Sequence, residues 1–180
     1  MKADSDFSAP IALDAINRLT APVVIEADAV QCSRLAERFA LLAVERLSGT
    51  LALARTGDVV TIDGSVEAAV QQACAATGTA IPTQIRETVH LKLVPAATLE
   101  AAEDEAEMEL DADALDIMGH DGKQIDLGAI IADTMALALD PFPRSPDADR
   151  ILRDAGVVSE EEAGSFGALA ALRDQMRGKD

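Results

Sequence analysis

Alternating apolar and polar residues constrain the fold of this chain more than any other feature. Between residues 89 and 93, apolar side chains alternate with His90 and Lys92, and this period of two predicts a strand with one buried and one solvent-exposed face. Other short runs rich in β-branched and apolar residues predict further strands. These runs lie at residues 22–25, 51–54, 59–62 and 66–70.

Local turn and capping signals connect these strands. Residues 55–58 contain Gly57, which can adopt the positive φ of a tight turn, so residues 50–63 are predicted to form a hairpin. Asp28 followed three residues later by Gln31 has the form of a capping box. Apolar residues then recur at helical spacing, which predicts a helix over residues 29–47.

Two more helices are predicted in the C-terminal half. Asp126 can cap a long apolar segment that Pro141 ends, and Ser165 can cap an amphipathic helix over residues 165–177. The predicted fold class is therefore α+β: a curved antiparallel sheet from the first 95 residues, packed by the helix in the N-terminal half and by two C-terminal helices. We expect one domain over residues 1–180, interrupted by a variable acidic segment at about 97–118.

The negative charge is concentrated in one part of the sequence. The 180 residues carry a net charge of −17, and residues 97–133 contain 12 acidic residues and one basic residue, Lys123. Such a charge opposes nonspecific binding to polyanions, because phosphate backbones bind proteins through lysine and arginine. The chain also has no Trp and no Tyr, which disfavours a single-strand nucleic-acid binder that stacks bases on aromatic rings. Basic or neutral partners fit better.

No targeting or membrane signal is visible in the sequence. The N-terminus has no apolar run followed by small residues, as a signal peptide would have. The longest uncharged stretch, residues 68–85, contains several Gln and Thr residues and is too polar to span a bilayer. We therefore expect a cytoplasmic protein without a membrane contact, and the sequence does not indicate its oligomeric state.

No catalytic or metal-binding motif is detectable. Cys32, Cys74, His90 and His120 are widely spaced, whereas structural zinc ligands usually come in close pairs. Phosphate-binding loops and serine-nucleophile motifs are missing from the sequence. Cys74 has no basic neighbour in sequence and is predicted to be a buried structural thiol. We expect no enzyme activity, cofactor or metal.

Four motifs in a fixed order resemble one bacterial family. They are Gln72-Ala73-Cys74-Ala75-Ala76-Thr77, a variable acidic stretch, the segment from Ile125-Asp126-Leu127 to Leu139-Asp140-Pro141, and Ser165-Phe166-Gly167-Ala168-Leu169. In this order and spacing, over roughly residues 20–176, the chain is similar to the YceD family of large ribosomal RNA subunit accumulation proteins.

The resemblance implies a function and a set of residues to examine. It implies a role in the accumulation of 23S ribosomal RNA, through its synthesis, processing or stability, without a known enzymatic reaction. Many relatives carry Cys-x-x-Cys where this chain has Cys74 and Thr77, so a metal site of those relatives is not implied here. The family-motif positions are Cys74, Asp126, Leu127, Asp140, Pro141 and Phe166.

Three functional hypotheses follow. The first is a non-enzymatic ribosome-biogenesis factor for the large subunit, whose partner is large-subunit ribosomal RNA or a basic ribosomal protein in an assembly intermediate. A variant of it is an acidic adaptor or chaperone that holds a basic ribosomal protein without contacting RNA, since opposite charges speed encounter.

RNA or partner contacts through arginine are a second hypothesis. The candidates are Arg34, Arg38 and Arg144, and the simpler explanation is that these arginines pair with nearby carboxylates. The third hypothesis is a metal-dependent hydrolase, which requires Asp121, Asp126 and Asp133 to cluster around a divalent ion.

Overall fold

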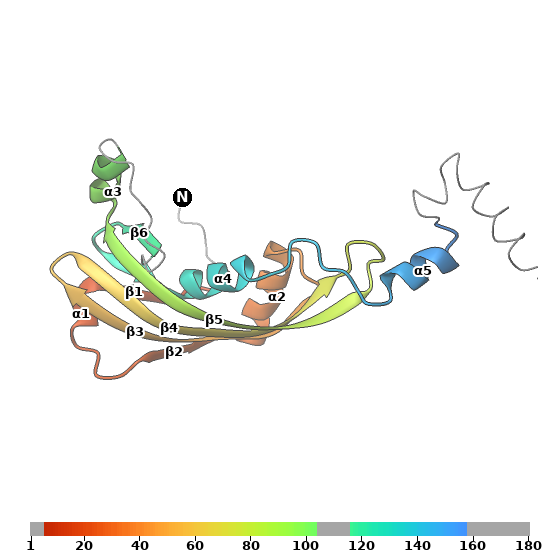
Figure 1. The fold of residues 1–180 in the computed structure, drawn as a ribbon. Coiled ribbons are helices and arrows are strands. Elements are labelled where there is room, and N and C mark those ends of the chain that lie inside the picture. Colours follow the sequence, from red (N-terminus) through yellow and green to blue (C-terminus); the bar gives the residue numbers. More distant parts are fainter. Residues whose placement is uncertain (1–5, 104–115, 158–180) are drawn as a thin grey trace, which may run out of the picture. The chain divides into compact units, whose positions relative to one another are not determined.

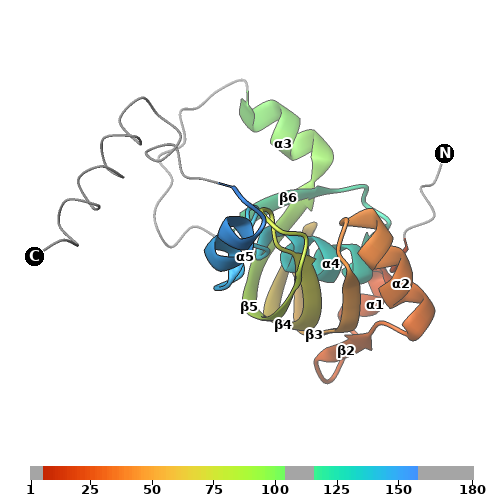
Figure 2. The same ribbon diagram turned by 90° about the vertical axis from the view of Figure 1, so that its right-hand side faces the viewer.

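The computed structural model describes residues 6–103 and 116–157, which form two compact units. The larger unit contains the described residues up to Gln72 together with Pro82–Pro141. The smaller unit contains Ala73–Ile81 and the described residues from Phe142 onward. Figures 1 and 2 show the ribbon of the chain in two views.

The larger unit is built on a five-stranded sheet, in the order β2-β3-β4-β5-β6. The pairs β2–β3 and β3–β4 are antiparallel, and β5–β6 is parallel. A short antiparallel pair, β1–β7, forms a second sheet. The strands are β1 Pro10–Ala12, β2 Val23–Glu26, β3 Ala43–Thr56, β4 Val59–Ala73, β5 Ala80–Pro95, β6 Asp116–His120 and β7 Gln124–Asp126. This mixed, mostly antiparallel architecture confirms the predicted α+β class.

Helices pack on one side of this sheet. Figure 1 shows the sheet curving, with α2 and α4 on its inner side. The core there consists of side chains from alternate strand positions and from α4, including the fully buried Ile62, Val66 and Ile131. Gly49 of β3 provides space for Ile131, because a Cβ atom at residue 49 would lie 2.6 Å from Cγ1 of that side chain. The helices are α1 Leu13–Ile16, α2 Ala29–Arg38, α3 Ala96–Glu103, α4 Leu127–Leu137 and α5 Ala148–Asp154.

The prediction of a helix over residues 29–47 is wrong at its C-terminal end. The capping box forms as predicted, with Asp28 accepting the amide of Gln31 and the Gln31 side chain accepting the amide of Asp28. However, α2 ends at Arg38, because Ala40 adopts φ 53° and the amide of Leu41 donates back to the carbonyl of Ala36 (2.9 Å). Glycine usually occupies this left-handed position, so the sequence contains no visible stop signal there.

The strands are longer than the short runs that predicted them. The Gly57 turn joins β3 to β4, and Gly57 has φ 61° as expected. The two predicted strands at 59–62 and 66–70 are one continuous strand, β4, which passes through Gly64. Gly64 is required there because a Cβ atom would overlap the backbone oxygen of Thr50 on the neighbouring strand.

The acidic part of the chain contributes to the sheet. The prediction took every strand from the first 95 residues, whereas β6 comes from residues 116–120 and adds the parallel pair, with Leu91 opposite Asp116 and Pro95 opposite His120. Residues 104–115 and the predicted helix over 165–177, with Phe166, lie outside the described residues. None of the described helices is long and apolar enough to cross a membrane.

Candidate functional site

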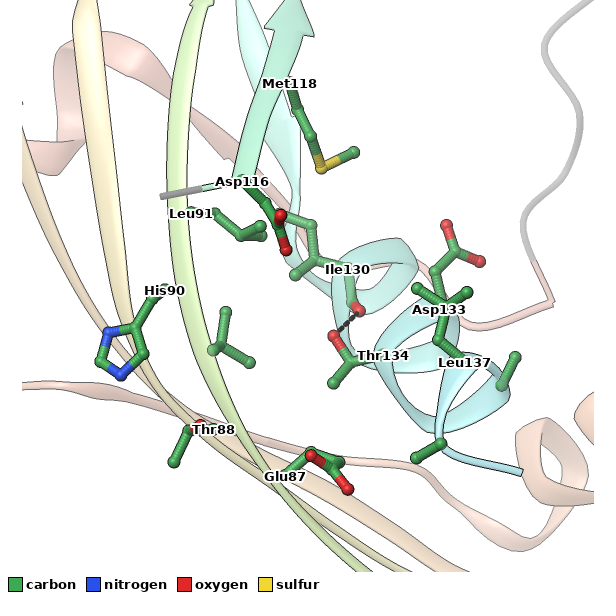
Figure 3. Close-up of a pocket in the computed structure, with 13 residues that line it drawn as sticks. Glu87, Thr88, His90, Leu91, Asp116, Met118, Ile130, Asp133, Thr134 and Leu137 are labelled. Carbon is green, nitrogen blue, oxygen red and sulfur yellow. Dashed lines mark hydrogen bonds between the residues drawn. The ribbon is translucent and has the colours of Figure 1, made fainter. Parts of the chain in front are cut away.

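A groove lies between β5 and α4, next to β6 (Figure 3). Its volume is about 660 Å³. Three elements that are distant in sequence line it, and the side chains that matter most are Glu87, Leu91, Asp116, Met118, Asp133 and Leu137. We call it the β5–α4 groove.

The alternation of β5 determines which of its side chains enter the β5–α4 groove. Val89 is buried, and Leu91 packs partly buried against the core. Thr88 and His90 point to the other side of the strand, away from α4, as Figure 3 shows. Glu87 lies on the same face of β5 as Val89, two residues further along the strand. Glu87 is nevertheless exposed, because no described element covers that part of the strand.

One face of α4 forms the opposite wall. Ile130 and Thr134 project toward β5, and Leu137, about one turn further along the helix, also lines the groove (Figure 3). The Thr134 hydroxyl donates to the carbonyl of Ile130 in its own helix (2.8 Å). This wall therefore offers mainly apolar surface, and the Leu137 side chain is 88% exposed.

Carboxylates surround this apolar surface. Glu87 and Asp116 lie on the strand side and Asp133 on the helix side (Figure 3). Arg38 of α2 forms an ion pair with Asp133, with 3.3 Å between Nη2 and Oδ1, and both side chains are about half exposed. His90 is hydrogen-bonded to Asp63 on the other side of the sheet (2.9 Å between Nδ1 and Oδ1). The β5–α4 groove is thus apolar at its floor and acidic at its rim.

Asp126 is a structural residue in the arrangement observed. Its Oδ1 atom accepts the amides of Ala129 (3.2 Å) and Ala9 (2.9 Å), and its Oδ2 atom accepts the Ser8 hydroxyl (2.7 Å). The first of these bonds caps α4 as predicted, and the other two tie the N-terminal segment to that helix. The neighbouring motif residue, Leu127, is buried in the core.

The Asp140-Pro141 motif contacts the sheet through its backbone. The side-chain amide of Gln72, which is buried, donates to the carbonyl of Asp140 (2.9 Å). The Gln72 oxygen accepts the hydroxyl of Thr83 from β5 (3.3 Å). Gln72 of β4 therefore links the segment after α4 to β4 and β5, and its local sequence gives no sign of this role.

Cys74 lies in a tight turn of the smaller unit. It is buried, and its sulfur accepts the amide of Ser145 (3.3 Å). The turn is closed by hydrogen bonds from the Cys74 amide to the Thr79 carbonyl and from the Gly78 amide to the Cys74 carbonyl. The Ser145 amide lowers the pKa of the thiol most, the Thr77 hydroxyl also lowers it, and the resulting pKa is about 6. The sequence shows no basic residue beside Cys74 that would lower its pKa. In the structure a backbone amide and a hydroxyl lower the pKa instead, and neither is visible as a sequence signal.

The candidate arginines are not brought together as one surface. Arg38 pairs with Asp133, and Arg144 pairs with Asp149 in the smaller unit. Arg34, on α2, has no carboxylate partner within 4.0 Å among the described residues. Two of the three candidates therefore already neutralise a carboxylate of this chain.

The three acidic residues of the hydrolase hypothesis line one shallow pocket of about 220 Å³. Nevertheless, no three metal-ligating side chains lie close enough to hold one ion within residues 6–103 and 116–157. Asp121 accepts the amides of Lys123 and Gln124, which lower the pKa of its carboxyl group. Together with the cap at Asp126 and the ion pair at Asp133, this engages all three carboxylates in the fold.

His120 is also occupied by the backbone. It is buried; its Nδ1 atom accepts the amide of Gly122 (3.0 Å), and its Nε2 atom lies 2.8 Å from the carbonyl of Asp58. Since Nδ1 accepts, the proton resides on Nε2 and is donated to that carbonyl. Both ring nitrogens serve to hold β6 against the β3–β4 turn.

The fold and this site define an α+β protein with an acidic, apolar-floored surface groove. Residues 62–173 match the family described as "Large ribosomal RNA subunit accumulation protein YceD". Since the match covers more than half of the chain, the protein belongs to the YceD family. No curated protein and no solved structure matches the chain.

Proposed function

We propose that this protein supports the accumulation of large-subunit ribosomal RNA by binding a basic component of the assembling large subunit, without catalysing a reaction. The family match carries the link to the large subunit, because the family is described by the accumulation of that RNA. The cytoplasm is the expected location of this work.

The surface chemistry favours a basic protein as the direct partner. The rim of the β5–α4 groove carries three carboxylates around an apolar floor, of which Asp133 is paired with Arg38, and the whole chain has a net charge of −17. Complementary charge raises the rate of encounter with a basic protein and opposes a polyanion. Arg38 and Arg144 offer less to phosphate groups because each already pairs with a carboxylate.

The proposal for the cell is tested by removing the gene and separating ribosomal particles on a sucrose gradient. We expect fewer large subunits relative to small subunits, restored when the full chain is expressed again. An unchanged ratio in rich medium and in the cold would count strongly against the proposal.

The proposal for the partner is tested by binding. The purified chain is titrated with basic large-subunit proteins and with fragments of large-subunit RNA at several salt concentrations. We expect binding to a basic protein. Salt-sensitive binding to the RNA that disappears on replacing Arg34, Arg38 and Arg144 would favour direct RNA contact instead.

A further inference from the structure

One edge of the main sheet is left open beside the β5–α4 groove. The sheet order places β6 on the outer side of β5, and β6 pairs only with Leu91–Pro95. Within the described part of the chain, residues 83–90 of β5 therefore have no strand on that side. A strand edge of this kind presents unpaired backbone amides and carbonyls, and folded proteins usually cover or block such an edge.

The open edge and the groove are parts of the same surface. Residues 87–91 of β5 line the groove. The pairing with β6 begins only at Leu91, so residues 87–90 belong to the open edge. A strand added along this edge would continue the position that β6 occupies in the sheet. Every second side chain of that strand would point into the groove, toward Leu137 and Ile130 of α4.

We infer that the β5 edge binds an extended segment of a basic protein, which adds a strand to the sheet. Backbone hydrogen bonds to residues 83–90 supply the attachment, and the groove selects for the side chains. Apolar side chains of the segment fill the space beside Leu137, and lysine or arginine side chains meet Glu87 and Asp116. This inference rests on the proposed function and specifies how its basic partner is held.

Charge favours this occupant over the alternatives within the chain itself. Residues 104–115, which precede β6, contain several acidic residues and no basic residue, so they would be repelled by Glu87 and Asp116. A second copy of the chain would bring an identical edge with the same carboxylates. Like charges placed opposite one another across a strand pair are destabilising.

The test measures binding of a fluorescein-labelled peptide to the full chain, by fluorescence anisotropy. Lysine and valine take turns at every second position of this peptide, with threonine between them, so that both residue types lie on the face that meets the groove. The first control is the same peptide with N-methyl groups on alternate backbone amides, which keeps every charge and side chain but cannot pair along a strand. We expect the methylated peptide to bind at least about tenfold more weakly. Equal binding of the two peptides would overturn the inference.

Matched variants of the protein locate the binding site. Glu87→Lys and Leu137→Lys alter the groove, and Glu26→Lys and Val24→Lys make the same changes at exposed positions of β2, at the opposite edge of the sheet. We expect each groove variant to weaken binding by roughly fivefold and each β2 variant to leave it nearly unchanged. Equal effects at both edges would indicate general electrostatic attraction and overturn the inference.

Other occupants give distinct results. If the peptide binds only after residues 104–115 are replaced by glycine and serine, the chain's own segment fills the groove. If sedimentation shows a dimer that Glu87→Lys dissociates, a second copy fills it. A fragment of large-subunit RNA whose binding is abolished by Leu137→Lys would assign the groove to RNA. Each of these three results overturns the inference.

The cellular and binding experiments fail separately. Peptide binding that is selective for the unmethylated backbone and weakened by Glu87→Lys, together with an unchanged large-subunit ratio in gene-deleted cells, would leave the strand-addition site standing and contradict the proposed function. A changed ratio in gene-deleted cells, with no peptide binding, would contradict only the strand addition.

Discussion

The backbone amide of Ser145 donates a hydrogen bond to the sulfur of Cys74, which lies 71 positions earlier in the sequence, across 3.3 Å. Together with the Thr77 hydroxyl, this amide favours the charged form of the thiol and lowers its pKa to about 6. Burial acts in the opposite direction but is the smaller effect. This turn thus favours the thiolate form of Cys74 at neutral pH.

We therefore expect the two cysteines to titrate in different pH ranges. In a Cys32→Ser variant, ultraviolet absorbance of the remaining thiolate should appear with a midpoint near pH 6. In a Cys74→Ser variant, the midpoint should lie above 9.0, because burial raises the pKa of Cys32. Thr77→Val should move the Cys74 midpoint upward, and Thr88→Val, at an exposed residue outside this turn, should not. A Cys74 midpoint near 9.0 would contradict the hydrogen-bonded turn.

The same shift predicts the pH dependence of stability. Because the pKa of Cys74 is lower in the folded protein than the ordinary 9.0, its contribution is fully present above pH 9 and declines as the pH falls through about 6. As the pH falls from above 9 to below about 6, the difference in the free energy of unfolding between the Cys32→Ser variant and the variant lacking both thiols should therefore shrink. Urea unfolding at several pH values measures it, and a difference that grows toward acid pH would contradict the sign.

Asp126→Ala should destabilise the larger unit more than the loss of an ordinary helix cap. The substitution removes the cap of α4 and leaves the amide of Ala9 without its carboxylate acceptor. We expect a loss of about 2–3 kcal/mol in the free energy of unfolding. Asp28→Ala, which removes only the cap of α2, should cost about 1 kcal/mol. Equal losses, measured in urea, would mean that the contacts to Ser8 and Ala9 contribute nothing.

Gly128→Ala should destabilise the protein although alanine is the better helix former. A Cβ atom at residue 128 would lie 2.6 Å from the carbonyl oxygen of Phe7 and 2.9 Å from the amide nitrogen of Ala9. Backbone atoms cannot move away cheaply, so we expect a net loss of about 1–3 kcal/mol. Gly57→Ala meets no neighbouring atom but has φ 61°, and should cost about 1 kcal/mol. Thermal unfolding followed by circular dichroism separates the two, and a stabilised Gly128→Ala would contradict the close approach.

The sequence predicts those parts of the fold that depend on neighbouring residues. The capping box at Asp28 and the cap at Asp126 are visible in the sequence because their partners lie within three positions. The end of α2 was missed, since Ala40 adopts a conformation that usually requires glycine. The parallel pairing of β6 was missed because it joins residues separated by the acidic stretch, and periodicity does not give strand direction.

The candidate site is less predictable than the fold for the same reason. The β5–α4 groove combines Glu87 with Asp133 and Leu137, and the low pKa of Cys74 depends on Ser145. Neither combination has a local sequence signal. The concentration of acidic residues was visible, but only the pairing in the sheet reveals that β5 has an open edge beside them.

The ion pair between Arg38 and Asp133 allows a last prediction about how this protein treats RNA. Both side chains are about half exposed and 3.3 Å apart, so a double-mutant cycle with Arg38→Ala and Asp133→Ala should give a coupling free energy of only about 0.2–1 kcal/mol. Arg38 also lies over the ring of Phe39, 4.9 Å from its centroid, and is thereby held in place at α2.

If Arg38 serves the fold in this way, Arg38→Ala should slightly lower stability and leave any affinity for large-subunit RNA unchanged. Asp133→Ala should then raise that affinity, because it releases the guanidinium from its partner. Measurement of RNA affinity for both variants at two salt concentrations decides the matter: a loss of affinity in Arg38→Ala would assign this arginine to RNA binding.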